Sequence, residues 1–153
     1  MDVALKKMSA AKVAYIRHIG PYSDCGAAWK KLFEWLGKKK LLEKTKRKIG
    51  ICYDDPAVTE PEKIRYDACI EIEGEIDGDD EISLKEIPSA VYAAALHVGP
   101  YEGLGKAYAY IYRQWMPENG KEIQADPTIE VYLNDPLEVS PEELKTEIYV
   151  PVK

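Results

Sequence analysis

The chain has 153 residues, of which 46% are hydrophobic, and a net charge of −6 at pH 7. This length is typical of one domain with a real core. An acidic chain lacks the positive footprint that sequence-independent nucleic-acid binding requires. The three cysteines form no CxxC pair, and no apolar stretch reaches the length of a signal or a membrane span. We therefore expect a cytoplasmic protein with no metal, no cofactor, no membrane association and no direct nucleic-acid contact.

The first half of the chain alternates apolar and polar residues in four stretches. This pattern predicts strands over residues 3–8, 13–19, 49–53 and 64–72. A helix is expected after Gly20-Pro21, with Ser23 or Asp24 as its N-cap. Its apolar residues recur at helical spacing and predict one buried stripe of Cys25, Trp29, Leu32, Phe33 and Leu36. The acidic run 73–81 contains two glycines and predicts a linker between the two halves of the chain.

The same order of elements then restarts in the second half. Strands are expected over residues 82–87, 90–98, 128–133 and 144–152. A helix over residues 102–116 is expected to end at Pro117 and Gly120. The residues expected to be buried on it are Leu104, Tyr108, Ile111, Tyr112 and Trp115.

One sequence stretch occurs twice, and it organises the whole chain. Residues 13–22 and 92–101 align with His18 on His97, an offset of 79 (97 − 18), and the later parts of the halves match at an offset of 80. A repeat of this kind predicts two copies of one module. We expect a single domain over residues 1–153, built from β-α-β-β modules at 3–73 and 82–153 with pseudo-twofold symmetry. Its class is α+β, with helices on one face of an antiparallel sheet and a ligand groove at the seam.

The two histidines occupy equivalent places in the repeat, directly before Gly-Pro. A catalytic triad needs one histidine placed against one nucleophile. Duplication at a strand end therefore favours a structural role for both His18 and His97.

Tyrosines and acidic residues are the stronger indications of a site. The chain has 11 tyrosines and one phenylalanine, and tyrosine offers a flat apolar body with a polar tip. Alternation in the last two strands predicts that Glu147 and Tyr149 share the face opposite the core with Glu130 and Tyr132. For Glu130 we favour a solvated sheet face. A carboxylate enclosed by aromatic rings, in contrast, needs a cationic or hydrogen-bonding partner.

Three features together resemble the GyrI-like small-molecule-binding family. They are the paired strand–Gly-Pro-Tyr–helix units, the stretch Glu130-Val-Tyr132-Leu-Asn-Asp135-Pro136, and the ending at residues 144–152. The family includes effector-binding domains of AraC-type and MerR-type multidrug regulators as well as stand-alone proteins. The resemblance implies two modules with a ligand groove between them. It also implies that a glutamate among aromatic residues receives cationic, lipophilic ligands, and motif position assigns that role to Glu147.

We expect a stand-alone module for lipophilic, cationic or aromatic small molecules, because the repeat uses the whole chain and leaves no helix-turn-helix. Its role would be sensing, sequestration or toxin resistance. The predicted ligand-binding residues are Glu147, Tyr149, Tyr132, Tyr112 and Trp115, the last two at the rim. One alternative is a hydrolase of electrophilic, cyclopropane-bearing natural products, in which Glu147 would orient or deprotonate water. Another is a protein that binds gyrase or a separate regulator through its acidic surface.

Overall fold

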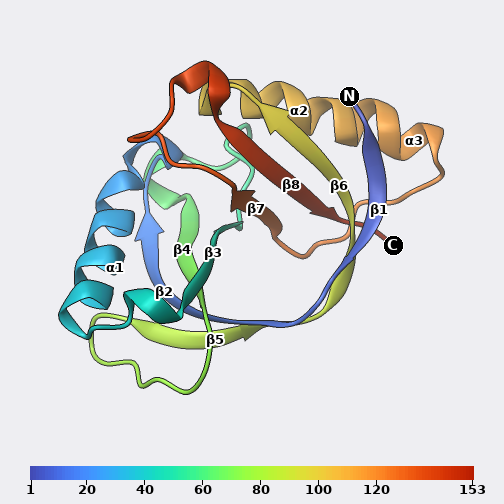
Figure 1. Ribbon diagram of the computed structural model, residues 1–153. Coiled ribbons are helices and arrows are strands. Elements are labelled where there is room, and N and C mark those ends of the chain that lie inside the picture. The colour runs from blue at the N-terminus through green and yellow to red at the C-terminus, as the bar shows by residue number, and fades with distance from the viewer. The chain divides into compact units, whose positions relative to one another are not determined.

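The computed structural model describes residues 1–153 and divides into two compact units. Unit 1 comprises Met1–Ser9 and Ser89–Lys153, and unit 2 comprises Ala10–Pro88. Each unit contains four antiparallel strands and one helical segment (Figure 1). The α+β class expected from the sequence is confirmed.

Unit 2 forms its sheet in the order β5-β2-β4-β3. The strands are β2 (Ala11–Ile19), β3 (Thr45–Cys52), β4 (Arg65–Ile72) and β5 (Ser83–Ile87). Helix α1 (Gly26–Lys38) packs on one face of this sheet. Its buried cluster consists of Ala14, Ala28, Leu32, Trp35, Leu36, Tyr66, Ala68, Ile70, Ile72 and Ile82.

Two details of α1 differ from the sequence-based expectation. Neither Ser23 nor Asp24 caps the helix, because residues 22–24 form a 3₁₀ turn and Cys25 occupies the N-cap without a side-chain bond. The buried stripe also lies further around the helix than predicted. Trp35 is buried, whereas Trp29 and Phe33 are only half-buried on the flank, where their rings stack at 6.1 Å between centroids.

Unit 1 repeats this arrangement in the order β1-β6-β8-β7. The strands are β1 (Val3–Met8), β6 (Ala90–Val98), β7 (Thr128–Tyr132) and β8 (Lys145–Pro151). The helical segment consists of α2 (Leu104–Tyr110), a π-helical turn (Ile111–Trp115) and α3 (Met116–Glu118). Its buried cluster consists of Ala93, Ala95, Ala107, Ile111, Met116, Ile148, Val150 and Val152.

The helical segment ends just before Gly120, whose positive φ of 63° stops it as expected, but Pro117 does not end it, because the segment continues through this residue to Glu118. The Met116 N–H bonds to the Ile111 carbonyl, a five-residue spacing that shifts the hydrogen-bond pattern directly before the proline. A proline lacks a donor and is tolerated where the helical ladder is already interrupted. None of the helices combines the length and the apolarity that crossing a bilayer requires.

The first strand of each sequence repeat pairs within the unit formed mainly by the other repeat. Strand β1 pairs with β6, and β5 pairs with β2. Only Ser9 and Ala10 join β1 to β2, and only Pro88 and Ser89 join β5 to β6. A two-residue hairpin needs positive φ angles, and none of these four residues has one. The chain therefore runs on into the next strand, and each compact unit contains one strand from the other repeat.

Candidate functional site

A carboxylate is buried among tyrosine hydroxyls on the helix-facing side of unit 1. Glu130, in the middle of β7, is only 7% exposed. Tyr108 of α2 donates to its Oε2 at 2.6 Å, and Tyr132 donates to its Oε1 at 2.7 Å. No lysine, arginine or histidine of the unit pairs with it. The expectation that Glu130 lies on a solvated face is wrong, since α2 covers it.

Aromatic rings extend from Glu130 in both directions. The Tyr108 ring stacks with Tyr112 one helical turn later, at 6.5 Å between centroids. The Tyr132 ring contacts Tyr101 edge to face at 5.9 Å. We call Glu130 and these four tyrosines the Glu130 cluster. Trp115 follows in the π-helical turn and packs against the apolar cluster of the unit.

An unpaired hydroxyl lies on the same side of the sheet. Thr146 pairs with Tyr132 across β7 and β8, so both side chains share the helix-facing side. Thr146 is fully buried, and its Oγ1 has no hydrogen-bond partner. Buried polar groups almost always have a partner, and an orphaned one calls for an explanation such as a ligand.

The structure divides the predicted ligand-binding residues between two faces. Glu147 pairs with Val131, whereas Tyr132 pairs with Thr146, so Glu147 and Tyr132 point to opposite sides of the sheet. Alternation misplaced β7 because both sides of this strand are covered, and Val131 and Glu130 are both buried. Tyr112 and Tyr132 therefore surround Glu130, while Tyr149 stays with Glu147. Sequence reasoning did not select the buried acid Glu130 as a candidate, because alternation placed it on a solvated face.

Glu147 is the more accessible of the two acids. Its side chain is 28% exposed, and it accepts a hydrogen bond of 3.0 Å from the Tyr149 hydroxyl. Lys6 Nζ lies 4.0 Å away, at the limit of an ion pair. Tyr149 is buried and contacts the Tyr92 ring edge to face. Glu147 thus has one distant cation and one hydroxyl.

Asp67 of unit 2 occupies the position equivalent to Glu147, at the offset of 80, in very different surroundings. Its carboxylate is fully buried. Arg17 donates from Nε at 2.9 Å and from Nη2 at 3.2 Å, and both Lys85 and the Tyr53 hydroxyl donate to Oδ2. Burial disfavours the charge, but these hydrogen bonds outweigh it and hold the pKa of Asp67 below its ordinary value. We call these four residues the Asp67 cluster.

Both histidines make the same local contact. His18 Nε2 lies 3.0 Å from the Pro21 carbonyl oxygen, and His97 Nε2 lies 2.9 Å from that of Pro100. This equivalence indicates a shared structural role in the turn that leads into each helix.

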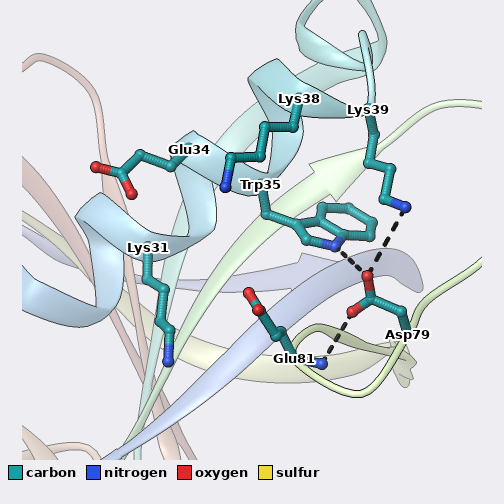
Figure 2. A pocket seen from close by; sticks show the side chains of 7 residues that line it. All are labelled: Lys31, Glu34, Trp35, Lys38, Lys39, Asp79 and Glu81. Carbon is teal, nitrogen blue, oxygen red and sulfur yellow. Dashed lines mark hydrogen bonds and ion pairs between the residues drawn. The ribbon is translucent and has the colours of Figure 1, made fainter.

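A concavity lies beside α1, where the loop of residues 73–81 meets the helix. Trp35 Nε1 donates to Asp79 Oδ2 at 2.7 Å, and Lys39 Nζ lies 3.9 Å from the same oxygen (Figure 2). The other Asp79 oxygen accepts the backbone N–H groups of Glu81 and Ile82. The lining carries both signs of charge, and its central acid is fully engaged in fastening the linker to α1. These contacts give the concavity a structural role.

Comparison with known proteins agrees with this architecture. The sequence model of the GyrI-like small molecule binding domain matches residues 1–153. The "Probable transcriptional regulator YgiV" of Escherichia coli (strain K12) is 34% identical over 105 residues, which is 68% of this chain and 66% of YgiV, just under two thirds of that relative.

Two solved structures share the fold. The EcmrR C-terminal domain has a TM-score of 0.79 at 22% identity, covering 99% of this chain and 97% of the other. SAV2435 bound to tetraphenylphosphonium has a TM-score of 0.67 at 16% identity, covering 100% and 94%. The match to the family along the whole sequence and the shared fold lead to one conclusion. This chain belongs to the GyrI-like small-molecule-binding domain family.

Proposed function

We propose that this chain binds lipophilic cations and flat aromatic compounds at the Glu130 cluster of unit 1. Glu130 supplies the counter-charge, and the rings of Tyr112 and Tyr132 supply the apolar walls. The observation that carries the proposal is a buried carboxylate held by two tyrosine hydroxyls with no cation paired to it.

The energetics of this carboxylate favour a cationic ligand. Burying an ionised group is costly unless it is paired and hydrogen-bonded. The two hydroxyls orient the Glu130 oxygens but carry no positive charge. A cation entering the cluster would gain attraction to the carboxylate and to the negative faces of the surrounding rings. The unpaired Thr146 hydroxyl offers one further polar contact.

In unit 2, the aromatic pair on helix α1, Trp29 and Phe33, already has a cation above it. Lys48 Nζ lies 5.1 Å from the Trp29 ring centroid and 5.6 Å from that of Phe33. At the offset of 79, Trp29 and Phe33 correspond to Tyr108 and Tyr112. This supports the proposal that the tyrosine pair of unit 1 accepts a cation supplied by a ligand.

The relatives support the ligand class and the biological role. SAV2435 was solved with a lipophilic cation, and YgiV is described as a probable regulator. On that basis the proposed role is sensing or sequestration of such compounds, including toxic ones.

Glu147 is the second candidate for the counter-charge, because the family resemblance assigns it this role. It has Tyr149 beside it but lies across the sheet from the Glu130 cluster. The two acids therefore form a matched pair for substitution.

The test is calorimetric titration with tetraphenylphosphonium and with neutral triphenylphosphine oxide. Glu130→Gln keeps the shape and removes the charge. We expect it to weaken binding of the cation by about 1.5–3 kcal/mol, the scale of a hydrogen bond to a charged group. Neutral-ligand affinity should stay the same. Glu147→Gln, the control, should leave both affinities near those of the wild type.

Three outcomes would contradict the proposal. If only Glu147→Gln weakens binding of the cation, Glu147 and not Glu130 supplies the counter-charge. Equal losses for both ligands in Glu130→Gln would show that charge is not recognised. The absence of binding to the wild type would reject the ligand class. Thermal unfolding of each variant checks that it remains folded.

A further inference from the structure

The positive charge of this acidic chain is concentrated in one segment of unit 2. Residues 30–48 contain nine basic and two acidic residues, a net charge of +7 within a chain of net −6. The corresponding residues of unit 1, 109–127, contain two basic and three acidic residues, a net charge of −1. Since both units build the same fold, the fold itself does not require these lysines.

The lysines of this segment are exposed and mostly unpaired. They lie on the outer side of α1, at its C-terminal end, and at the start of β3. Among the seven exposed ones, only Lys39 forms an ion pair, with Asp79, and Lys46 lies near enough to Glu71 to attract it without an ion pair. The six others, which we call the lysine surface, are Lys30, Lys31, Lys38, Lys40, Lys44 and Lys46. Figure 2 shows Lys31 and Lys38 extending from α1 without reaching an acid.

Helix stabilisation explains only part of this surface. Basic residues in the last turn of a helix interact favourably with its dipole, and this effect falls off within that turn. It accounts for Lys38 and its neighbours at the end of α1. Lys30 and Lys31 lie in the middle of the helix, and Lys44 and Lys46 follow it, so the dipole accounts for none of these four.

We propose that the lysine surface binds the phosphate backbone of duplex nucleic acid without sequence preference. Lysine contacts phosphate as a point charge and is depleted at protein–protein interfaces. Binding of single strands relies on exposed aromatic rings. Trp35, beside Lys31 and Lys38, is buried, and the half-buried rings of Trp29 and Phe33 stack on each other with Lys48 over them. Insertion into a membrane needs an apolar face, and the exposed apolar side chain here is Leu42 alone. This proposal revises the expectation of no nucleic-acid contact, which rested on the chain-wide net charge of −6. The net charge of +7 over residues 30–48 supplies a local positive footprint, and the local potential is what a bound duplex experiences.

Nearby acids limit the strength of this surface. Glu34 and Glu43 lie within the segment, and Glu81 lines the concavity beside Lys31 and Lys38. Asp79 is engaged by Trp35, Lys39 and two backbone N–H groups. We therefore expect weak, salt-sensitive binding in the range of non-specific complexes, with Kd on the order of 10⁻⁴–10⁻⁶ M.

The test is fluorescence anisotropy with a labelled 20-base-pair DNA duplex in low and moderate salt. With about four phosphate contacts, affinity should fall on the order of 100-fold between 50 and 200 mM salt. A variant with Lys30, Lys38, Lys40 and Lys46 changed to Gln should bind at least tenfold more weakly, and its salt dependence should be much shallower. The control changes Lys7, Lys106, Lys145 and Lys153 of unit 1 to Gln, which gives the same net charge and should bind within about twofold of the wild type.

Equal losses in the two variants would show that only net charge matters and would overturn the proposal. Failure of the wild type to bind DNA in low salt would do the same. Tighter binding to polyglutamate or to phosphatidylserine vesicles than to DNA would assign the surface to an acidic protein or a membrane instead. Circular dichroism confirms that both variants are folded, and the tetraphenylphosphonium titration should be unchanged in them.

Discussion

The two units have an acid at equivalent positions of β4 and β8, but the two acids differ in burial and in their charged partners. Asp67 in unit 2 is fully buried and is satisfied by Arg17, Lys85 and Tyr53. Glu147 in unit 1 is partly exposed, and its nearest cation lies 4.0 Å away. The equivalent of Arg17 in unit 1 is Leu96, and that of Tyr53 is Leu133. Unit 2 therefore has a buried, fully hydrogen-bonded ion cluster at this position, and unit 1 has leucines in place of two of its members.

The helix-facing sides of the units differ in the same direction. Unit 2 places Lys48 over its aromatic pair, and Gly50 stands where unit 1 has Glu130. Unit 2 therefore contains its own cations on both sides of its sheet. At the corresponding places on its sheet, unit 1 has the acids Glu130 and Glu147, and the cation near them is Lys6, 4.0 Å from Glu147. The two copies of the module therefore differ in one respect: unit 2 supplies cations to its buried groups, and unit 1 leaves Glu130 with tyrosine hydroxyls alone.

The largest expected effect comes from removing the acid of the closed cluster. Asp67→Asn leaves the Arg17 and Lys85 charges without their partner, and breaking a buried ion pair in this way costs roughly 3–5 kcal/mol. Glu147→Gln, the matched change in unit 1, should cost less than about 1 kcal/mol, because its cation is distant and the site is partly exposed. Urea unfolding at pH 7 measures both. Equal losses of unfolding free energy in the two variants would contradict the claim that Asp67 contributes more to stability than Glu147.

The packing of α1 gives the next effect. Leu32 is fully buried, so Leu32→Ala should cost about 3 kcal/mol, within the usual range for a core leucine. Phe33 is half-buried, so Phe33→Ala should cost about 1–2 kcal/mol, below the usual range for a buried phenylalanine. Urea unfolding of both variants measures which substitution lowers the free energy of unfolding more. A larger loss for Phe33→Ala would mean that the half-buried flank is the true core.

Exchanging one residue between the units tests the comparison directly. Arg17→Leu gives unit 2 the residue of unit 1 and should cost about 2 kcal/mol, since a hydrogen-bonded charge loses its partner. Leu96→Arg places an arginine beside Glu147, where partial exposure limits the gain to about 0–1 kcal/mol. Both variants are compared by denaturant unfolding. Strong destabilisation by Leu96→Arg would show that unit 1 cannot accommodate the cluster.

The smallest expected effect appears in acid. The pKa of Asp67 is held below its ordinary value, so the stability that it contributes is present above the unfolded pKa of about 3.9. That contribution is lost as the pH falls through the lower pKa of the folded state. The wild type should therefore lose stability more steeply below about pH 4 than Asp67→Asn does. Parallel pH profiles in the two proteins would exclude Asp67 as a source of the acid sensitivity.

Much of the architecture could be predicted from local pattern. The repeat around His18 and His97, the strands with clear alternation and the two helices all follow from periodicity and Gly-Pro breaks. These signals are local, so they need no knowledge of neighbours. The α+β class follows from them, because strands and helices of these lengths can bury their apolar sides only against one another.

The tertiary structure alone decided which side chains meet. Alternation placed Glu130 and Glu147 on one face, but β7 is covered on both sides, and the true register puts Glu130 under Tyr108. Pairing of β1 with β6 likewise depends on a connection that does not turn back, which a strand pattern does not encode. Apolar pattern reports that a residue is buried. Only the packing partner determines which face buries it and whether an acid there finds a cation of its own.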